Sequence, residues 1–414
     1  MNDWSPAERR MRFRFSLYGF LKNQRYFEPF WILAFLEKDL GFFEIGLLVG
    51  FRSLCINLLE VPSGALADSY GRRATMVASF SAYIVAFSLF AYADTLLGLF
   101  PGMFFMAIGE AFRSGTHKAM IFDWLRSVGR ESERVQVYGY TRSWSKMGSA
   151  LSALLAAALV FVLKDYSVVF WLSALPCVLN IFNFLSYPQS VEGEPGKKQS
   201  GGVASLLWKA AQVAWRDRRQ RRLLIESMGF EGIFTAGKDY LQPLVQQTAL
   251  ALPVLLALAD AQRTALFAGV VYSLLFFFSG IASRHAHSVV AWKKNEEEAS
   301  RFLWIIVLCC YAILLPSLYA GWGGVSIAAF VGIYLVQNLW RPALVSRLNE
   351  ASDPALSATT LSIESQARSV TTLLVAPLLG WSVDAWGLWP VGALGVVVSF
   401  AALWIRRKDR VVSH

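Results

Sequence analysis

The sequence predicts an all-α, polytopic membrane protein with twelve transmembrane helices in two pseudo-symmetric six-helix bundles. Of its 414 residues, 55% are hydrophobic and only 16% are charged, whereas soluble proteins carry roughly 25% charged residues. Apolar stretches of about 20 residues, the length that spans a bilayer as a helix, recur along the chain. One long polar break divides these stretches into two sets of six.

Hydropathy, together with Gly, Pro and charged residues at the ends, sets the bounds of the apolar stretches. The break at 188–222 contains a Gly-rich, Lys-rich piece and then a basic amphipathic piece, which predicts a linker and a helix on the inner leaflet. We therefore predict an N-terminal bundle at 1–187, a cytoplasmic linker at 188–222 and a C-terminal bundle at 223–414. The predicted spans are 15–36, 43–66, 73–93, 96–120, 135–163, 167–187, 223–246, 263–283, 302–320, 324–345, 357–380 and 386–405.

The distribution of basic residues predicts the orientation. About 26 Lys and Arg residues fall on the side of the N-terminus, against about three on the other side, and cytoplasmic loops attract basic residues. The first fourteen residues hold four arginines and lack the apolar run of a cleaved signal peptide. We expect an integral protein of a bacterial-type inner membrane, in contact with lipid, with both termini in the cytoplasm.

Composition also argues against several partners. The formal charge is +10, but the basic residues are scattered between apolar spans rather than clustered on one face, so no nucleic-acid partner is expected. All four cysteines lie in apolar stretches, where a free thiol behaves as a small hydrophobe. No His and Cys residues have zinc-type spacing. We expect no metal site, no cofactor and a monomer.

A polar turn is expected at 64–73, which reads Gly-Ala-Leu-Ala-Asp-Ser-Tyr-Gly-Arg-Arg between two predicted spans. Gly64 lets another helix approach closely, and Gly71 permits a sharp bend. Asp68 supplies a negative charge that can meet the N-terminal end of a neighbouring helix or pair with an arginine. The two arginines at the end can anchor the turn at a membrane surface. An ordinary basic turn has the same chemistry, so the residues alone leave both interpretations open.

The same residues resemble the signature loop of the major facilitator superfamily, G-x-L-A-D-x-x-G-R-[RK]. That resemblance implies a twelve-helix transporter fold in which this loop latches the two halves on the cytoplasmic side. The G-x-x-x-D-x-x-G spacing recurs at 380–387, where it is also a common turn pattern. The positions that match the signature, and that form the expected gate, are Gly64, Leu66, Asp68, Gly71, Arg72 and Arg73.

Charged residues inside the spans indicate the functional region. A charge at membrane depth costs at least about 2.5 to 3.5 kcal/mol on insertion scales, so it normally faces a partner, the bundle interior or water. Two spans carry polar residues at helical spacing, namely Glu110, Arg113, Ser114 and His117, and Glu231, Thr235, Lys238 and Gln242. The residues expected to line a substrate cavity or to couple transport are Arg25, Glu110, Arg113, Glu231, Lys238, Glu364 and Arg368.

A purely structural interpretation competes with this one. Glu110 and Arg113, and likewise Glu364 and Arg368, are spaced to pair on their own helices, and such ion pairs would only lock the bundle together. Charges near helix ends can snorkel to the interface or serve the gate. We place Lys22, Glu60, Lys118 and Asp123 in that group.

The resemblance implies a cavity lined by the family's first, fourth, seventh and tenth helices. Leu59-Glu60-Val61-Pro62-Ser63 and the 109–115 segment resemble bacterial drug and metabolite transporters of the superfamily. The 142–151 segment departs from the proline-containing motif of the proton-coupled antiporters, and only its Gly148 matches. This departure leaves proton exchange open.

We therefore predict a secondary active transporter, not an enzyme, that moves a small, charged or zwitterionic organic solute by alternating access. The expected type is proton-coupled drug or metabolite efflux, in which protonation of Glu110 or Glu231 changes the favoured state. An organic-anion importer or a uniporter on the same fold is the alternative, as is a non-transporting receptor or a lipid flippase. The sequence contains no G-x-x-x-x-G-K-[ST] motif for ATP-driven pumping.

Overall fold

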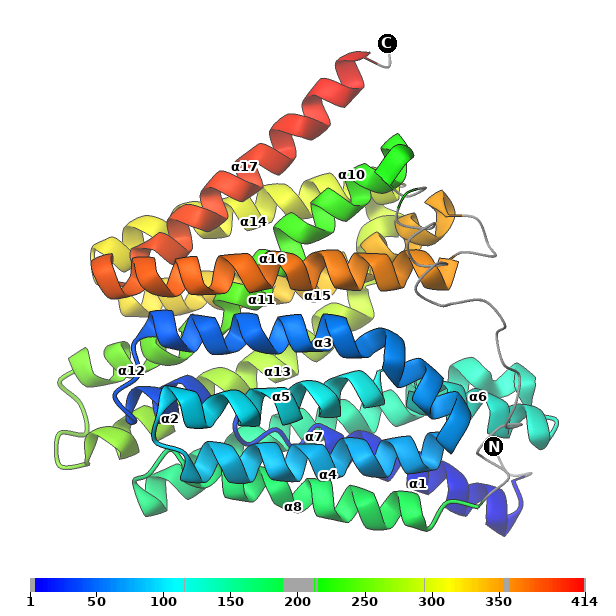
Figure 1. The fold of residues 1–414 in the computed structure, drawn as a ribbon. Helices are drawn as coiled ribbons and strands as arrows, with labels where there is room; N and C mark the ends of the chain where they lie inside the picture. The colour runs from blue at the N-terminus through cyan, green and yellow to red at the C-terminus, as the bar shows by residue number, and fades with distance from the viewer. Residues whose placement is uncertain are drawn as a thin grey trace. The chain divides into compact units, whose positions relative to one another are not determined.

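The computed structural model describes residues 4–114, 116–188, 212, 215–293, 295–352 and 357–412, which are helices and their connections without a β-strand. Each predicted span coincides with one helix or a short series of helices (Figure 1). Eight of the described helices are long and apolar enough to cross a membrane. The all-α prediction is therefore confirmed.

The helices of the first half are α1 (Pro6–Lys22), α2 (Trp31–Leu36), α3 (Phe42–Tyr70), α4 (Arg72–Tyr92), α5 (Leu96–Arg113), α6 (Thr116–Ser127), α7 (Arg134–Leu163) and α8 (Val168–Leu185). The second half contains α10 (Arg218–Ser227), the π-helical η3 (Met228–Gly232), α11 (Ile233–Gly237), the 3₁₀ turn η4 (Lys238–Tyr240), α12 (Leu241–Ala251), α13 (Asp260–Lys293), α14 (Glu296–Tyr319), α15 (Gly323–Ala351), α16 (Ser357–Trp386) and α17 (Trp389–Val412). The 3₁₀ turn η1 (Glu131–Glu133) precedes α7. Most of the predicted linker lies outside the described residues.

The predicted 15–36 span is not one helix. α1 ends at Lys22, and the chain then makes local turns until α2 begins. Pro29 lies in these turns and cannot supply a helical N–H. The backbone N–H of Phe27 instead donates to the hydroxyl of Ser173 at 3.2 Å. The break is sustained because a neighbouring helix satisfies a freed backbone group.

The predicted 96–120 span is also broken. α5 ends at Arg113, Ser114 is extended with φ −61° and ψ 124°, and α6 starts at Thr116. The expectation that Glu110 and His117 share one face of a continuous helix is therefore wrong. His117 is buried and stacks on the ring of Tyr18 at 3.7 Å between centroids, so it belongs to the core.

The expected polar turn at 64–73 is much shorter than predicted. α3 continues to Tyr70, and Gly71 alone separates it from α4. Gly71 has φ +87°, a conformation that residues with a Cβ rarely adopt. The bend attributed to Gly71 is confirmed, while the assignment of residues 64–70 to a loop is wrong because the helical hydrogen bonds continue through them.

The chain forms two compact units. Unit 1 comprises Met1–Lys38, Cys55–Ser200 and Leu258–Phe276. Unit 2 comprises Asp39–Leu54, Gly201–Ala257 and Phe277–His414. The bundle boundaries expected at 187 and 223 stay a prediction.

In unit 1, α4 packs between α5 and α8, and α1 packs on α7 (Figure 1). Small residues permit the second contact, because a Cβ on Gly19 would lie 2.7 Å from the hydroxyl of Ser145. A Cβ on Gly148 would similarly meet the carbonyl of Phe20 at 2.5 Å. Such small residues let membrane helices approach closely.

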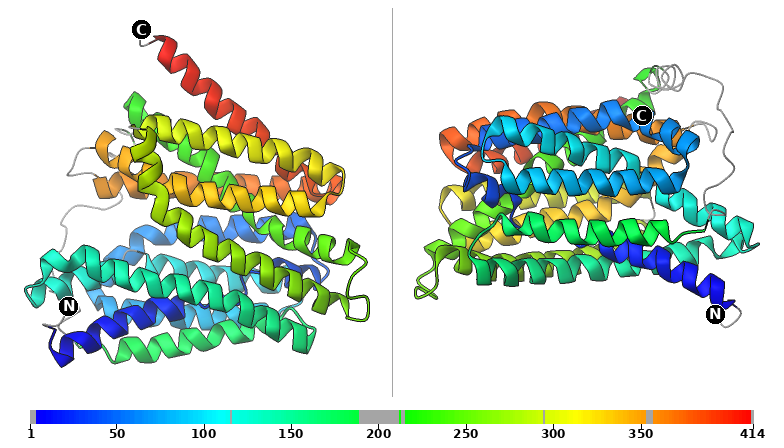
Figure 2. Two further views of the ribbon diagram at one scale, coloured as in Figure 1. Left: turned by 180° about the vertical axis from the view of Figure 1, so that it is seen from behind. Right: turned by 60° about the horizontal axis from the view of Figure 1, so that its bottom comes forward.

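In unit 2, α14 packs against α15 and α17, and α16 packs against η3 and α11. The C-terminal part of α17 extends past the other helices of this unit (Figure 2). The core contains a cluster of aromatic rings, in which Phe230 stacks on Trp340 at 4.3 Å between ring centroids. These contacts position the π-helical segment η3 and therefore Glu231.

Candidate functional site

Unit 1 contains a pocket lined by charged residues from two interrupted helices. Lys22 is the last residue of α1, Arg25 lies in the turns after it, and Glu110 and Arg113 belong to the last turn of α5. The pocket holds about 430 Å³ of space free of protein atoms, including its open mouth. Three predicted cavity residues, Arg25, Glu110 and Arg113, are thus brought together with Lys22, which the sequence suggested would snorkel.

The cations of this pocket are incompletely paired. Arg25 lies 3.7 Å from the carboxylate of Glu28. The Nε of Arg113 donates to the hydroxyl of Tyr83 at 3.3 Å. Among the side chains that the structure describes, no carboxylate lies within 4.0 Å of the charged nitrogens of Lys22 or Arg113. The pairing of Glu110 with Arg113 expected from their spacing does not occur.

Aromatic and apolar side chains form the rest of the pocket wall. Tyr83 is 8% exposed and its ring lies against Gly109, where a Cβ would approach the ring to 2.8 Å. Ser79 secures this crossing of α4 and α5 by donating to the carbonyl of Gly109 at 2.6 Å. The remaining lining residues are Leu21, Gln24, Phe27, Phe80, Phe87, Met106, Ser173, Pro176 and Cys177.

In unit 2, Glu364 is fully buried and bonded on both oxygens. Arg341 donates to its two carboxylate oxygens at 2.6 and 2.8 Å, and Ser227 donates to one of them. A bidentate arginine is a strong, oriented partner for a carboxylate. The expected partner, Arg368 on the same helix, lies 3.8 Å from Glu231 instead. The ion pair of Glu364 therefore links α16 to α15.

Glu231 lies in the π-helical segment η3 and is 4% exposed. It accepts a hydrogen bond from Gln337 at 2.9 Å and lies 3.8 Å from Arg368. The second distance is long for an ion pair, so the carboxylate is held more loosely than that of Glu364. Single π-helical turns occur frequently at functional sites.

Lys238 follows seven residues after Glu231, in η4. Its ammonium pairs with Asp239 at 2.9 Å, and its carbonyl accepts from the hydroxyl of Tyr334 at 3.0 Å. Lys238 also lines a small pocket of unit 2 whose other walls are mainly apolar. The polar stripe expected at Glu231, Thr235, Lys238 and Gln242 is confirmed only in part. Gln242 is buried, and the hydroxyl of Thr235 donates to the carbonyl of Glu231.

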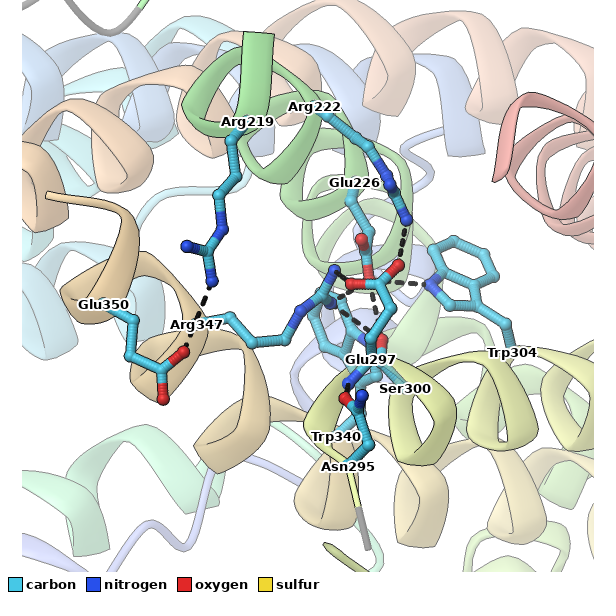
Figure 3. Close-up of polar contacts among 10 residues, drawn as sticks. All are labelled: Arg219, Arg222, Glu226, Asn295, Glu297, Ser300, Trp304, Trp340, Arg347 and Glu350. Carbon is cyan, nitrogen blue, oxygen red and sulfur yellow. Dashed lines mark hydrogen bonds and ion pairs between the residues drawn. The ribbon is translucent and has the colours of Figure 1, made fainter. Parts of the chain in front are cut away.

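A second buried cluster joins α10, α14 and α15 (Figure 3). Glu226 accepts from Ser300 at 2.8 Å, from Trp304 at 3.2 Å and from Arg347 at 3.0 Å. Arg347 also binds Glu297, which in turn pairs with Arg222. The hydrogen bonds and ion pairs of this cluster connect α10, α14 and α15.

Two of the expected gate residues have partners in unit 1. Arg72 pairs with Asp123 of α6, and Arg73 donates to the carbonyl of Tyr187 at 3.1 Å. The side chain of Asp68, like the surroundings of Gly64, lies outside the described part of the chain. The structure thus leaves the proposed latch of Asp68 as a prediction.

Sequence reasoning missed the roles of Lys22, Tyr83 and Asp239. That Lys22 and Tyr83 line the pocket can be inferred only once the end of α1 and the crossing of α4 and α5 are known. Asp239, next to Lys238, could have been noticed as a neighbouring opposite charge. Within the described residues, no three His, Cys, Asp or Glu side chains gather as a metal site.

The sequence profile described as Major Facilitator Superfamily matches residues 23–368. The chain belongs to this superfamily. It is therefore a transporter and an integral membrane protein, and the expectation that it is not an enzyme is confirmed.

Known proteins similar to this transporter fit that assignment. An uncharacterized MFS-type transporter, YxaM of Bacillus subtilis (strain 168), is 20% identical over 384 residues, covering 90% of this chain and 88% of the relative. The nucleoside transporter NupG has a similar crystal structure, with a TM-score of 0.77 at 12% identity over 95% of this chain and 98% of that one. A POT family transporter in complex with 5-aminolevulinic acid gives a TM-score of 0.68 at 15% identity, covering 96% of each chain. At these identities the two structures establish a common fold.

Proposed function

We propose that this transporter is a secondary active carrier of a small, charged or zwitterionic organic solute, coupled to protons and working by alternating access. The observation that carries the proposal is the unit 1 pocket, where Lys22, Arg25, Glu110 and Arg113 face a common space. Charged groups at membrane depth are costly unless they serve a partner or an aqueous path. A charged solute is such a partner.

The interrupted helices support alternating access. Binding sites of secondary transporters are typically built where helices are discontinuous, because unwound backbone and helix ends can face a solute. Here the breaks after Lys22 and Arg113 both adjoin the pocket. The similar proteins are nucleoside and peptide transporters, which also suits a small organic solute.

Glu231 is the carboxylate that we propose for proton coupling. Glu364 is held by two short bonds from Arg341, so its protonation would break a strong pair. Glu231 has one hydrogen bond and a distant arginine. Its protonation would release Arg368 at smaller cost and change the balance between two conformations.

We also propose that both termini are cytoplasmic, that the membrane is a bacterial inner membrane and that a cytoplasmic linker at 188–222 joins an N-terminal bundle at 1–187 to a C-terminal bundle at 223–414. The positive-inside asymmetry of the loops supports the orientation. Efflux is the proposed direction, with the solute leaving as protons enter. Import or uniport on the same fold remains the alternative that transport assays separate.

Reconstitution in proteoliposomes tests the coupling. Glu231→Gln keeps a hydrogen-bond acceptor but cannot take up a proton, so gradient-driven transport should be lost while equilibrium exchange of the solute continues. Glu350→Gln is the matched control, because Glu350 makes an exposed pair with Arg219. If Glu231→Gln keeps its full dependence on a pH gradient, the coupling role is wrong. Counterflow of equal size with and without a pH gradient in the wild type would indicate a uniporter.

A further inference from the structure

We propose that the unit 1 pocket binds an organic monoanion: a single carboxylate attached to a planar, apolar ring. This inference rests on the proposed transport function and specifies the class of solute. The carboxylate would meet Arg113 and Lys22, and the ring would lie against Phe80, Tyr83 and Phe87.

The balance of charge supports an anion. The pocket and its rim hold three cations, Lys22, Arg25 and Arg113, and two carboxylates, Glu110 and Glu28. Counted formally, these five side chains carry one excess positive charge. An uncompensated charge that is shielded from water is expensive, and a bound monoanion would neutralise it. A dianion would exceed the available charge and would meet repulsion from Glu110.

The geometry of the donors favours a carboxylate. Arg113 donates from its Nε to Tyr83 at 3.3 Å and also has the hydroxyl of Tyr18 as a neighbour, and these two contacts orient the guanidinium beside the pocket. A guanidinium edge fits the two oxygens of a carboxylate in a bidentate pair. Lys22 adds a point charge to the same space.

The apolar wall favours a planar ring. Tyr83 and Phe87 are nearly parallel, with 16° between their rings and 6.2 Å between centroids. Phe80 lies 6.0 Å from Tyr83, and Phe27 lies 5.2 Å from Phe87. All four rings line the pocket, and aromatic side chains favour packing against another ring.

Binding to the purified full chain in detergent tests the proposal by titration calorimetry. The probes are 2-naphthoate and benzoate, their neutral isosteres 2-naphthamide and benzamide, the cation benzylammonium, and decanoate as a flexible lipid-like carboxylate. The two aromatic carboxylates should bind at least about tenfold more tightly than any other probe, because they alone satisfy both the cations and the rings. Equal or tighter binding of the amides, of benzylammonium or of decanoate would overturn the proposal.

Variants locate the binding. Arg113→Gln should weaken 2-naphthoate binding at least about tenfold and leave the binding of 2-naphthamide unchanged, while Arg113→Lys should restore part of the loss. Arg142→Gln is the control, since it removes a nearby positive charge from an exposed residue that does not line the pocket. If Arg113→Gln does not fold, Lys22→Gln carries the same test. Unchanged 2-naphthoate binding in the folded variant would exclude the pocket.

Transport assays separate this inference from the proposed function. Gradient-driven flux of a neutral or cationic solute, with no binding of the aromatic carboxylates, would overturn the solute class and leave the carrier function intact. Binding of 2-naphthoate that depends on Arg113, without flux of any probe in proteoliposomes, would support the site and contradict the carrier function.

Discussion

At the scale of residues, the buried charges of this transporter divide into those with a close partner and those without one. Glu364 and Glu226 are held by arginines from other helices. Lys22 and Arg113 face a pocket instead, with no described carboxylate within 4.0 Å. The first kind joins helices, and the second kind is the one that we propose for solute binding.

The pair of Glu364 and Arg341 predicts a large stability effect. Glu364→Gln removes the buried negative charge and leaves Arg341 without its partner, which should lower the free energy of unfolding by about 3 kcal/mol. Denaturant titration in detergent measures the change. Glu350→Gln, in an exposed pair with Arg219, should cost less than about 1 kcal/mol. Equal losses in the two variants would contradict the assignment of Glu364 as a structural anchor.

Gly71 predicts a backbone effect. Gly71→Ala places a Cβ at φ +87°, so it should destabilise the protein by about 1 kcal/mol or more. Gly139→Ala is the control, because Gly139 lies inside α7 with open space around it, where Ala should be neutral or stabilising. Thermal unfolding in detergent should give a lower midpoint for Gly71→Ala alone. A similar midpoint for both variants would show that the turn tolerates a side chain.

At the scale of elements, interruptions of helices determine which side chains reach the site. The break after α1 brings Arg25 beside Glu110 and Arg113, and the π-helical segment η3 carries Glu231. In unit 2, α16 and the first part of α3 pack closely, because Gly46 lies against the backbone of Ala376. The start of α3 is therefore held by α16.

Asp384 should contribute to the stability of the contact between α16 and the start of α3. Its carboxylate accepts from the backbone N–H groups of Phe42 and Phe43 at 2.9 and 2.8 Å, which caps the first turn of α3. Asp384→Ala should destabilise the protein by about 1 kcal/mol, as loss of a helix cap does, measured as a lower thermal midpoint in detergent. Glu350→Ala, which removes one side of an exposed pair with Arg219, serves as the control. A midpoint unchanged by Asp384→Ala would mean that the cap contributes nothing to stability.

At the scale of the whole molecule, a carrier must interconvert two conformations without unfolding. The signature residues around Asp68 are the expected latch, and Arg72 and Arg73 hold the adjacent end of α4 to α6 and to Tyr187, just after α8. A latch that stabilises one conformation affects the rate of transport more than the stability of the fold.

Asp68 therefore predicts a loss of transport. Asp68→Asn removes the negative charge that can meet a helix N-terminus, so flux in proteoliposomes should fall at least about tenfold with a nearly unchanged thermal midpoint. Asp165→Asn changes an exposed aspartate that caps the start of a turn, and it should transport normally. Wild-type flux in Asp68→Asn would remove the latch from the mechanism.

Much of the fold could be predicted because hydropathy is a local property. Each of the twelve predicted spans contains helix, since about 20 apolar residues in lipid must satisfy their own backbone hydrogen bonds. The interruptions were not predicted. Pro29 gave a warning for the first break, but the extended Ser114 and the π-helical segment at Glu231 have no comparable signal in hydropathy.

The sequence by itself determined that this chain is a helical membrane protein of the major facilitator type with unusual charges inside its spans. Only the tertiary structure decided which charges pair. Spacing along one helix suggested that Glu110 would meet Arg113 and that Glu364 would meet Arg368, yet Arg341 of α15 binds Glu364 and Tyr83 of α4 accepts from Arg113. The physical reason is that hydropathy acts residue by residue, whereas pairing depends on where helices break and cross.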